Sequence, residues 1–239
     1  MMRASLALAV AAALLATGCE TTQERSAQIG RSLGHQGAAT GRLHLGAANR
    51  GVHVLRSAVV RAGSQSAVAV ELSNPGGRAQ ASFPVLIAVR DAHGRTVYRN
   101  DTEGIEPSLQ RLALLPAHTS EWWVDNEVLA AAPTSVSVAV GASAAVVPHT
   151  TPLITTSGAN ASASFPGPHV SVTLSNRSAS VQHGLAVYAV ILDGGRVVGA
   201  GRAIVAQLAA HASASVVIPV IGSVDGRTIS ITAAPGQLG

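Results

Sequence analysis

Apolar residues alternate with small or polar residues along most of this chain, and this two-residue period predicts short β-strands. The alternation is clearest over residues 68–74, where Val and Leu alternate with Ala, Glu and Ser up to a Ser-Asn turn. Residues 83–89 and 185–192 are more continuously apolar, which is typical of central strands. No helix longer than a turn or two is implied after the first 18 residues, so the pattern predicts an all-β protein.

The same strand pattern occurs twice, so the chain contains an internal repeat. Residues 68–74 return as 170–176, and the central strand that ends at Asp91 returns at the same offset as one that ends at Asp193. Further along, equivalent positions follow a shorter offset, because the first copy holds about nine more residues between Asp91 and Leu115. One β-unit has therefore been used twice.

Turn signals divide each copy into short segments, about seven strands spaced ~8–12 residues apart, and so predict two tandem antiparallel β-sandwiches of immunoglobulin-like type. We expect the first sandwich over residues 49–147 and the second over residues 148–239. The linker around 148–152 is short, which favours an end-to-end arrangement of the two units. In the second unit, a turn is expected at 158–160, directly after the first strand.

The N-terminus carries an export signal. A short positive region is followed by an apolar stretch of ~13 residues, too short for a bilayer-spanning helix, which needs ~20. The segment ends in Leu15-Ala16-Thr17-Gly18-Cys19, which resembles the lipobox of bacterial lipoproteins. The resemblance implies a signal peptide over 1–18 and lipidation of Cys19 with diacylglycerol and a further acyl chain such as palmitate. An ordinary cleaved signal that ends near a Cys is the alternative.

The residues that follow this signal are polar and rich in Gly, Ala and Ser, so 19–48 is predicted to be a lipidated flexible tether. Cys19 is the only Cys in the chain, which excludes a disulfide within it. The lipobox resemblance therefore implies a protein held to membrane lipid in the bacterial cell envelope and exposed outside the cytoplasm.

The two repeats resemble the FxLYD-type domains of bacterial envelope lipoproteins, over about 68–138 and 170–231. The shared features are a strand that ends in Asn, a central strand that ends in Asp91 or Asp193, a Gly turn, and a Leu-containing strand that leads into a turn. The aromatic positions of that motif are occupied by non-aromatic residues in both copies. The resemblance implies a fold and does not imply a chemistry.

The amino-acid composition bears on how the cores are built and on whether the protein binds nucleic acid. Hydrophobic residues make up 47% of the chain and aromatic residues only 3%, so the cores must be built from Val, Ile, Leu and Ala. The net charge of +4 comes from Arg residues that are scattered singly, without a basic run or interleaved aromatic residues. Since a clustered basic patch is the expected footprint of a nucleic-acid binder, no nucleic-acid partner is expected.

Two adjacent Trp residues are the most prominent candidate binding residues. Neighbouring residues on a strand point to opposite faces, so one of Trp122 and Trp123 should lie in the core and the other should face outward. Exposed aromatic side chains can anchor a partner, which makes Trp122, Trp123 and Tyr98 candidate partner-binding residues. The second copy has Ser215 and Val216 at the positions of the two Trp residues, so the fold does not need them. Packing between the two units is the alternative.

An acidic loop in the extra segment of the first copy is a candidate Ca²⁺ site. Asp101, Glu103 and Glu106 offer closely spaced hard oxygens, although their spacing is not that of an EF-hand and loops are commonly acidic. No other metal site is expected, because the His residues lack paired spacing or a Cys partner. His118 and His211 fall in the same turn before the same strand, which suggests a backbone-capping role.

No catalytic constellation stands out. The chain has no Gly-x-Ser-x-Gly or Ser-x-x-Lys motif and no phosphate-binding loop, so neither enzyme activity nor a cofactor is expected. The sequence therefore predicts a membrane-anchored envelope lipoprotein that acts as a non-catalytic protein-interaction or scaffolding module with an envelope protein as its partner. We expect the Trp strand and the acidic loop to form the contact surface. The alternative is a lipoprotein that binds a small ligand or an envelope glycan.

Overall fold

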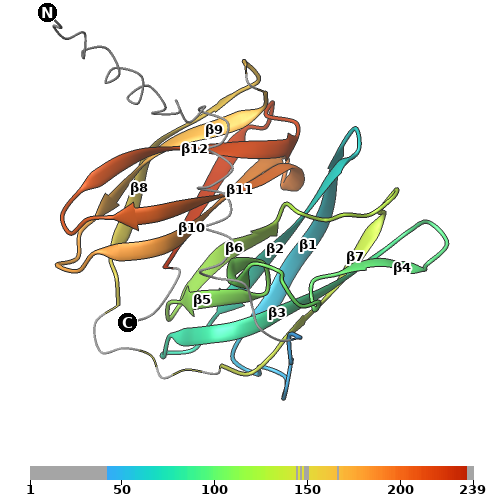
Figure 1. Cartoon of the computed structure of the whole chain (residues 1–239), viewed down its shortest axis with the longest axis horizontal. Helices are drawn as coiled ribbons and strands as arrows, with labels where there is room; N and C mark the ends of the chain where they lie inside the picture. Colours follow the sequence, from blue (N-terminus) through green and yellow to red (C-terminus); the bar gives the residue numbers. More distant parts are fainter. Residues whose placement is uncertain (1–41, 144, 146, 148–150, 166, 236–239) are drawn as a thin grey trace, which may run out of the picture. The chain divides into compact units, whose positions relative to one another are not determined.

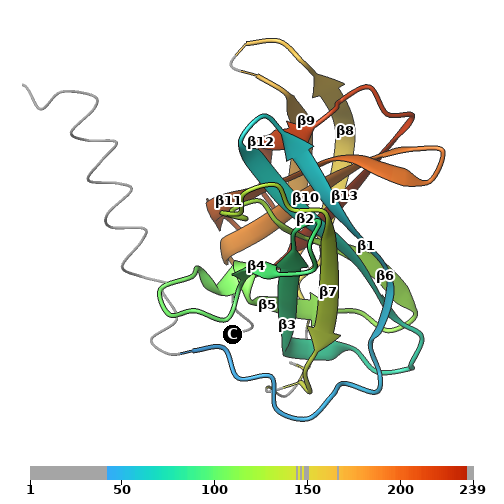
Figure 2. The same cartoon turned by 90° about the vertical axis from the view of Figure 1, so that its right-hand side faces the viewer.

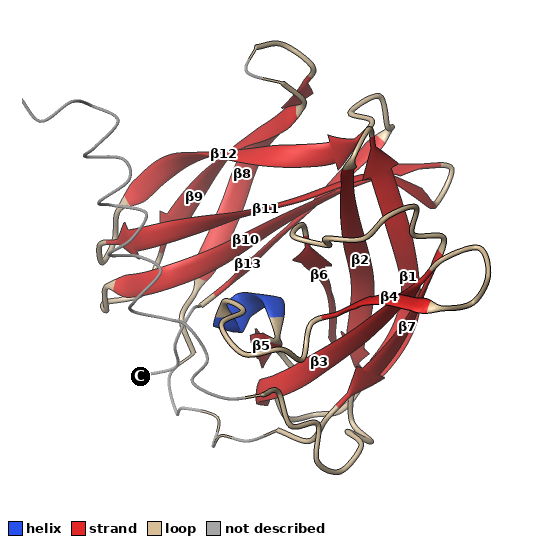
Figure 3. Ribbon diagram, turned by 45° about the vertical axis from the view of Figure 1, so that its right-hand side comes forward, coloured by secondary structure: helices blue, strands red, loops and turns tan. Residues whose placement is uncertain are grey.

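The described residues of the computed structural model are 42–143, 145, 147, 151–165 and 167–235, and they form antiparallel strands β1 to β13 with one short 3₁₀ helix, η1 (Figures 1 and 3). The predicted all-β class and the antiparallel sandwich architecture are confirmed. Within the described part of the chain, no helix is long and apolar enough to cross a bilayer. The predicted signal peptide, Cys19 and most of the predicted tether lie outside the described residues.

Both repeats use the same strand order. The first repeat comprises β1 (His53–Ala62), β2 (Gln65–Asn74), β3 (Gln80–Arg90), β4 (Thr96–Arg99), η1 (Pro107–Leu109), β5 (Arg111–Leu115), β6 (Thr119–Asp125) and β7 (Ser135–Val140). The second comprises β8 (Ile154–Ser162), β9 (His169–Asn176), β10 (Gln182–Asp193), β11 (Arg196–Leu208), β12 (Ser213–Gly222) and β13 (Thr228–Ala234). In the first, sheet β1-β2-β6 lies opposite a sheet in which β3 pairs with β4, β5 and β7. In the second, β8-β9-β12 lies opposite β13-β10-β11, and the two parts join where β11 pairs with β12.

The extra segment of the first copy interrupts one strand. In the second repeat, β11 pairs with β10 along nearly its whole length. In the first repeat, its place is taken by two strands, β4 and β5, which pair with opposite ends of β3. Residues 100–110 lie between β4 and β5 and include η1, and they account for the additional residues that the repeat comparison predicts. The segment therefore leaves the sheet and becomes available for other contacts.

The Asn at the end of β2 and β9 ties each sandwich together. The Asn74 side chain is fully buried, and its Nδ2 donates to the carbonyl oxygens of Leu115 at 3.3 Å and Pro116 at 3.0 Å. Asn176 donates to the carbonyl oxygens of Leu208 and Ala209 at the same two distances. Buried polar groups need such partners, so this side chain holds the strand end against the turn that precedes β6 or β12.

The two repeats share apolar packing instead of lying end to end as the short linker suggested. Alternate residues of β10, such as Leu185 and Val187, point into the core of the second repeat. Tyr188 and Val190, on the opposite face of the same strand, pack in one cluster with residues of the first repeat. All described strands accordingly fall in a single compact unit. The nearly continuous apolar character of β10 reflects burial on both faces.

Two local expectations also need correction. The predicted turn at 158–160 is a bulge inside a continuous β8, where Gly158 adopts a φ of +65° and the register with β9 shifts. The end of the predicted tether contacts the first repeat, since the Leu43 amide donates to the carbonyl oxygen of Asp101 and Ala48 forms a β-bridge with Gly141.

Candidate functional site

The contact between the repeats gathers most of the chain's notable polar and aromatic side chains, and we call it the junction. It forms where the outer face of β2 and β6, which includes Ala69 and Trp122, meets β10, β11 and β13 of the second repeat (Figure 2). Ala67 and Ala69 have no exposed surface, although the alternation in β2 predicted a half-buried strand. Small side chains there allow the two sheets to approach closely.

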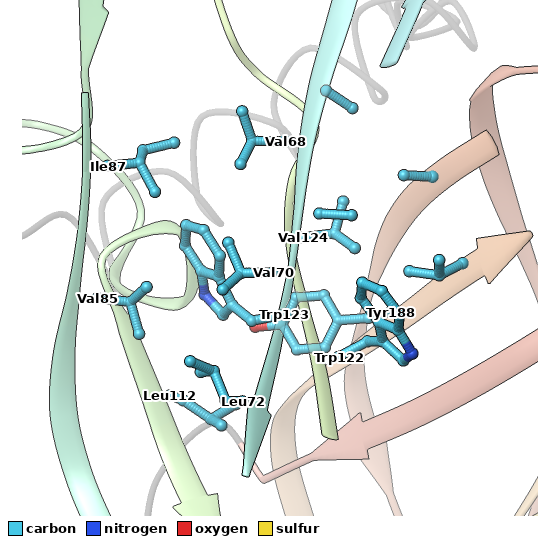
Figure 4. Packing of buried hydrophobic residues seen from close by; sticks show 14 of the residues in the cluster. Val68, Val70, Leu72, Val85, Ile87, Leu112, Trp122, Trp123, Val124 and Tyr188 are labelled. Carbon is cyan, nitrogen blue, oxygen red and sulfur yellow. The ribbon is translucent and has the colours of Figure 1, made fainter. Parts of the chain in front are cut away.

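The adjacent Trp residues point to opposite faces, as the strand geometry requires (Figure 4). Trp123 lies in the core of the first repeat, and its Nε1 donates to the carbonyl oxygen of Ser108 at 2.8 Å. Trp122 lies on the other face, packed beside Tyr188 of the second repeat, and is only 4% exposed. The expectation of an outward-facing Trp that binds a partner is therefore corrected: the core of the first repeat buries Trp123 and the second repeat covers Trp122, so neither indole is free. Trp122 instead packs between the two repeats, which was the alternative interpretation of the sequence.

Arg202 is the central charged residue of the junction, and its side chain is only 6% exposed. Its guanidinium donates to the carboxylate of Glu106 and, at 2.6 Å, to Oγ of Ser108, both in the extra segment of the first repeat. A second nitrogen reaches Glu127 at 3.3 Å. A buried charge is tolerated only when it is paired and hydrogen-bonded, so these contacts fasten β11 to the first repeat.

A second polar pair lies beside this cluster. The Tyr98 hydroxyl donates to Oδ2 of Asp125 at 2.8 Å, and the backbone amide of Glu127 donates to Oδ1 at 2.9 Å. Burial raises the pKa of the Asp125 carboxyl to about 6, although the bonds from Glu127 and Tyr98 act in the opposite direction. Burial, with the nearby Asp125 charge, also raises the pKa of Tyr98. Tyr98 is half-buried, and its hydroxyl is engaged within the chain.

Two more contacts close the junction around Trp122. Its backbone amide donates to Oγ1 of Thr232 on β13 at 3.1 Å. The Arg56 guanidinium lies 5.2 Å from the centroid of the Trp122 ring, a cation–π distance, and donates to the carbonyl oxygen of Gly195 in the second repeat at 2.8 Å. Arg56 thus joins β1 of the first repeat to the β10–β11 turn.

The three carboxylates of the acidic loop are not gathered into a site. Asp101 pairs with Arg99 at 2.8 Å, and Glu106 caps η1 and pairs with Arg202. Glu103 is exposed on the loop between them. Among the residues that the structure describes, no group of three His, Cys, Asp or Glu side chains could hold a metal ion. The loop's closest carboxylate contacts are therefore with Arg.

His118 and His211 occupy equivalent turns with the same backbone conformation. Their φ angles are +58° and +56°, in the left-handed region that non-glycine residues seldom adopt. Each turn immediately precedes the strand β6 or β12 and contains the carbonyl groups that the buried Asn side chains bind. Each His therefore supplies the left-handed residue of the turn that joins the two sheets of its repeat.

Several junction residues, among them Arg202, Asp125 and Tyr188, were not singled out by the sequence. Arg202 is the one charged residue between Val197 and Leu208 in a strand otherwise made of small and apolar residues with one Gln, which is a usable signal of a buried charge. As far as the structure describes the chain, every buried side-chain nitrogen or oxygen has a hydrogen-bond partner. The junction thus satisfies its own polar groups.

No family model matches the chain, and none of the curated proteins matches it. Among solved structures, the crystal structure of red sea bream transglutaminase is similar over 92% of this chain and 32% of that chain, with 14% sequence identity and a TM-score of 0.22. This chain spans about a third of that protein's length, and a likeness at this TM-score carries no argument about activity.

Proposed function

We propose that the protein is a lipid-anchored envelope protein that acts as a non-catalytic interaction or scaffolding module. The observation that carries the proposal is the use of the junction residues. Trp122, Arg202 and Asp125 are all buried. Trp122 and Arg202 bond across the junction to Thr232 and Glu106, and Asp125 bonds to Tyr98 and Glu127 beside it. Side chains with catalytic or ligand-binding potential are thus used to join the two repeats, and sheet surface remains for contact with partners.

The proposed anchor is Cys19. Several acyl chains on one residue hold a protein stably at a membrane, whereas a single chain binds only marginally. Because the two repeats are joined by apolar packing and by the Arg202 ion pairs, they present their outer surfaces in a fixed relation. A module of this kind binds through surfaces of preset geometry, which lowers the ordering cost of association.

Metabolic labelling with palmitate, followed by membrane fractionation, tests the anchor. We expect the wild-type chain to be labelled and to sediment with membranes, and Cys19→Ser to lose both properties. Ser26→Ala, a few residues beyond the lipobox, is the matched control and should behave as wild type. An unlabelled wild-type chain, or a Cys19→Ser chain that remains labelled, would contradict the proposal.

A further inference from the structure

One end of the first repeat carries charge of a single sign. The strand register brings together there the starts of β1 and β3 with the ends of β2 and β7, so the end comprises residues 47–53, 75–79, 116–118 and 141–143. We call it the tether-side end, because the chain leads into it from the predicted tether (Figure 2). Arg50 and Arg78 are exposed there, and the four ranges contain no Asp or Glu. Within the described chain, neither Arg takes part in an ion pair.

Hydrogen bonds hold distant segments together at the tether-side end. The Asn49 side chain donates to Oε1 of Gln80 at 3.3 Å, and the Gly51 amide donates to Oδ1 of Asn49 at 2.9 Å. Arg50 lies between the first and last of these bonded residues of its segment, and Arg78 lies two residues before Gln80. The fold thus brings close together Arg residues that are scattered singly along the sequence.

A third cation and two apolar side chains lie beside these Arg residues. Arg111, at the start of β5, is half-buried, and its Nη1 lies 3.5 Å from the carbonyl oxygen of Ser82 near the start of β3. Val54 and Leu55, at the start of β1, are 39% and 55% exposed. Exposed apolar side chains next to cations are typical of surfaces that bind at a membrane interface.

The opposite end of the first repeat differs, because it carries charges of both signs. Arg61 and Arg90 are exposed there, close to the ends of β1 and β3. The turns at that end also contain Asp91, Asp125 and Glu127. Charges of mixed sign give little net attraction to a surface of one sign. The single-sign charge is therefore a property of the tether-side end and not of the whole repeat.

We propose that the tether-side end docks on anionic lipid headgroups of the membrane that holds the anchor, an inference that rests on the lipid anchor proposed above. Arg50, Arg78 and Arg111 complement the negative charge of such headgroups. Each Arg close to an anionic surface strengthens binding about fivefold. Val54 and Leu55 are placed to enter the apolar edge of the interface.

The position of the predicted tether favours this end over the opposite one. Cys19 precedes Arg42 by 23 residues, and a flexible Gly-rich linker of that length spans about 25 Å on average. Residues 47–49 then lie along the end of β7, before β1 begins. An anchor at Cys19 therefore keeps the tether-side end at a high effective concentration near the headgroups, so that a few cations suffice for docking.

Quenching of a site-attached fluorophore by nitroxide-labelled phosphatidylcholine tests the docking. The lipidated protein is reconstituted in phosphatidylcholine vesicles with and without phosphatidylglycerol. The lipid occupies the Cys19 thiol, so an introduced Cys carries the label. Ala142→Cys labels the tether-side end and Ala92→Cys the opposite end, both at exposed positions. We expect quenching only of the Ala142→Cys label, only with phosphatidylglycerol, and its loss at high salt, which screens the attraction.

Paired substitutions separate the local charge from the net charge. Arg50→Gln with Arg78→Gln should lower the ratio of docked to undocked protein about thirtyfold, since each Arg contributes about fivefold. Arg61→Gln with Arg90→Gln removes the same net charge from the opposite end and should leave the ratio unchanged. Equal effects of the two pairs, equal quenching of the two labels, or equal quenching without phosphatidylglycerol would overturn the inference.

Flotation of the same samples distinguishes a failure of docking from a failure of the anchor. A chain that floats with both kinds of vesicle, but whose Ala142→Cys label is never quenched, contradicts the docking alone. A chain that floats only with phosphatidylglycerol vesicles contradicts the anchor and supports the docking surface. A chain that floats with neither contradicts both.

Discussion

The outer faces of two equivalent sheets differ in this molecule: one is buried and the other is exposed. In the first repeat, the face of β1-β2-β6 carries Ala69 and Trp122 and is covered by the second repeat. In the second repeat, the face of β8-β9-β12 carries Ser171 and Ser215 at the same positions and is open. The backbones pair in the same order. The comparison shows that a few side chains on a common scaffold decide whether a sheet face becomes interior or surface.

The extra segment adds a second difference between the repeats. Only the first repeat has residues 100–110 between two strands, and Glu106 and Ser108 from this segment reach Arg202 of the second repeat. The Ser108 carbonyl oxygen also accepts bonds from Trp123 and Tyr188. Residues 100–110 thus contact both repeats at once. The second repeat has no equivalent segment between β10 and β12, since β11 is continuous there.

Truncation of the two equivalent residues gives the largest contrast between the faces. Trp122→Ala removes a buried indole from the junction and should lower the free energy of unfolding by about 4 kcal/mol. Ser215→Ala alters an exposed position and should change it by less than about 0.5 kcal/mol. Urea denaturation of both variants measures the difference. Similar losses from the two substitutions would show that the two faces are not used differently.

Removal of both carboxylates that face Arg202 should have the next largest effect. The double variant Glu106→Gln, Glu127→Gln leaves a guanidinium whose side chain is only 6% exposed without its two paired carboxylates. Unpaired buried charges are strongly destabilising, but both Glu side chains are partly exposed, so we expect a loss of about 3 kcal/mol.

Asp101→Asn in the same segment is the control for the charge pair. Its partner Arg99 is nearly half exposed, and exposed ion pairs contribute about 0–1 kcal/mol. Denaturation at low and high salt measures both variants. A double variant no less stable than Asp101→Asn would contradict the role assigned to Arg202.

The buried acid of the junction makes stability depend on pH. The pKa of Asp125 is raised to about 6 from 3.8, so the folded protein retains this proton where the unfolded chain has lost it. The stability that Asp125 contributes is therefore fully present below about pH 4 and declines as the pH rises toward 6, by about 2 to 3 kcal/mol. Asp125→Asn cannot titrate, and its stability relative to wild type should rise by this amount between pH 4 and pH 7.

The exposed Asp193 supplies the control for this pH dependence, since its side chain is 56% exposed. Asp193→Asn should not reproduce the rise, and the unfolding free energies of wild type and both variants are compared at each pH. A constant difference between wild type and Asp125→Asn would show that Asp125 is not held in a protonated state by burial.

The smallest effect is one that the two repeats should share. Asn74→Ala and Asn176→Ala each remove the amide that donates to two carbonyl oxygens of the following turn. Each should cost about 1 to 2 kcal/mol, and the two losses should be similar because the bonds to the turn carbonyls have the same lengths. Thermal unfolding monitored by circular dichroism would detect a marked inequality, which would mean that the repeats do not use this Asn in the same way.

Features internal to one repeat could be predicted from the sequence. The opposite directions of Trp122 and Trp123 follow from strand geometry alone. The equivalence of the Asn-terminated strands and the position of the extra segment followed from the two offsets. The Asp91 turn also agrees with expectation, since its Oδ1 accepts bonds from the backbone amides of His93 and Arg95. Such features depend on local periods and local hydrogen bonds, which one sequence records directly.

The junction could not be predicted in this way, because it depends on contacts between distant segments. Ala67 and Ala69 look like the outer side of a half-buried strand, and an Ala on an outer face fits both solvent and close sheet packing. Tyr188 has no charge or motif to mark it. The available signal was the apolar character of β10 on both faces, which indicates two buried sides, although it does not identify what covers the second one.

Differential scanning calorimetry of the chain tests most directly whether the junction makes the two repeats one structural unit. We predict a single transition whose van't Hoff and calorimetric enthalpies agree, since the repeats share apolar packing and the buried Arg202 cluster. Two resolved transitions in the wild-type chain, each with the enthalpy of one repeat, would contradict the account.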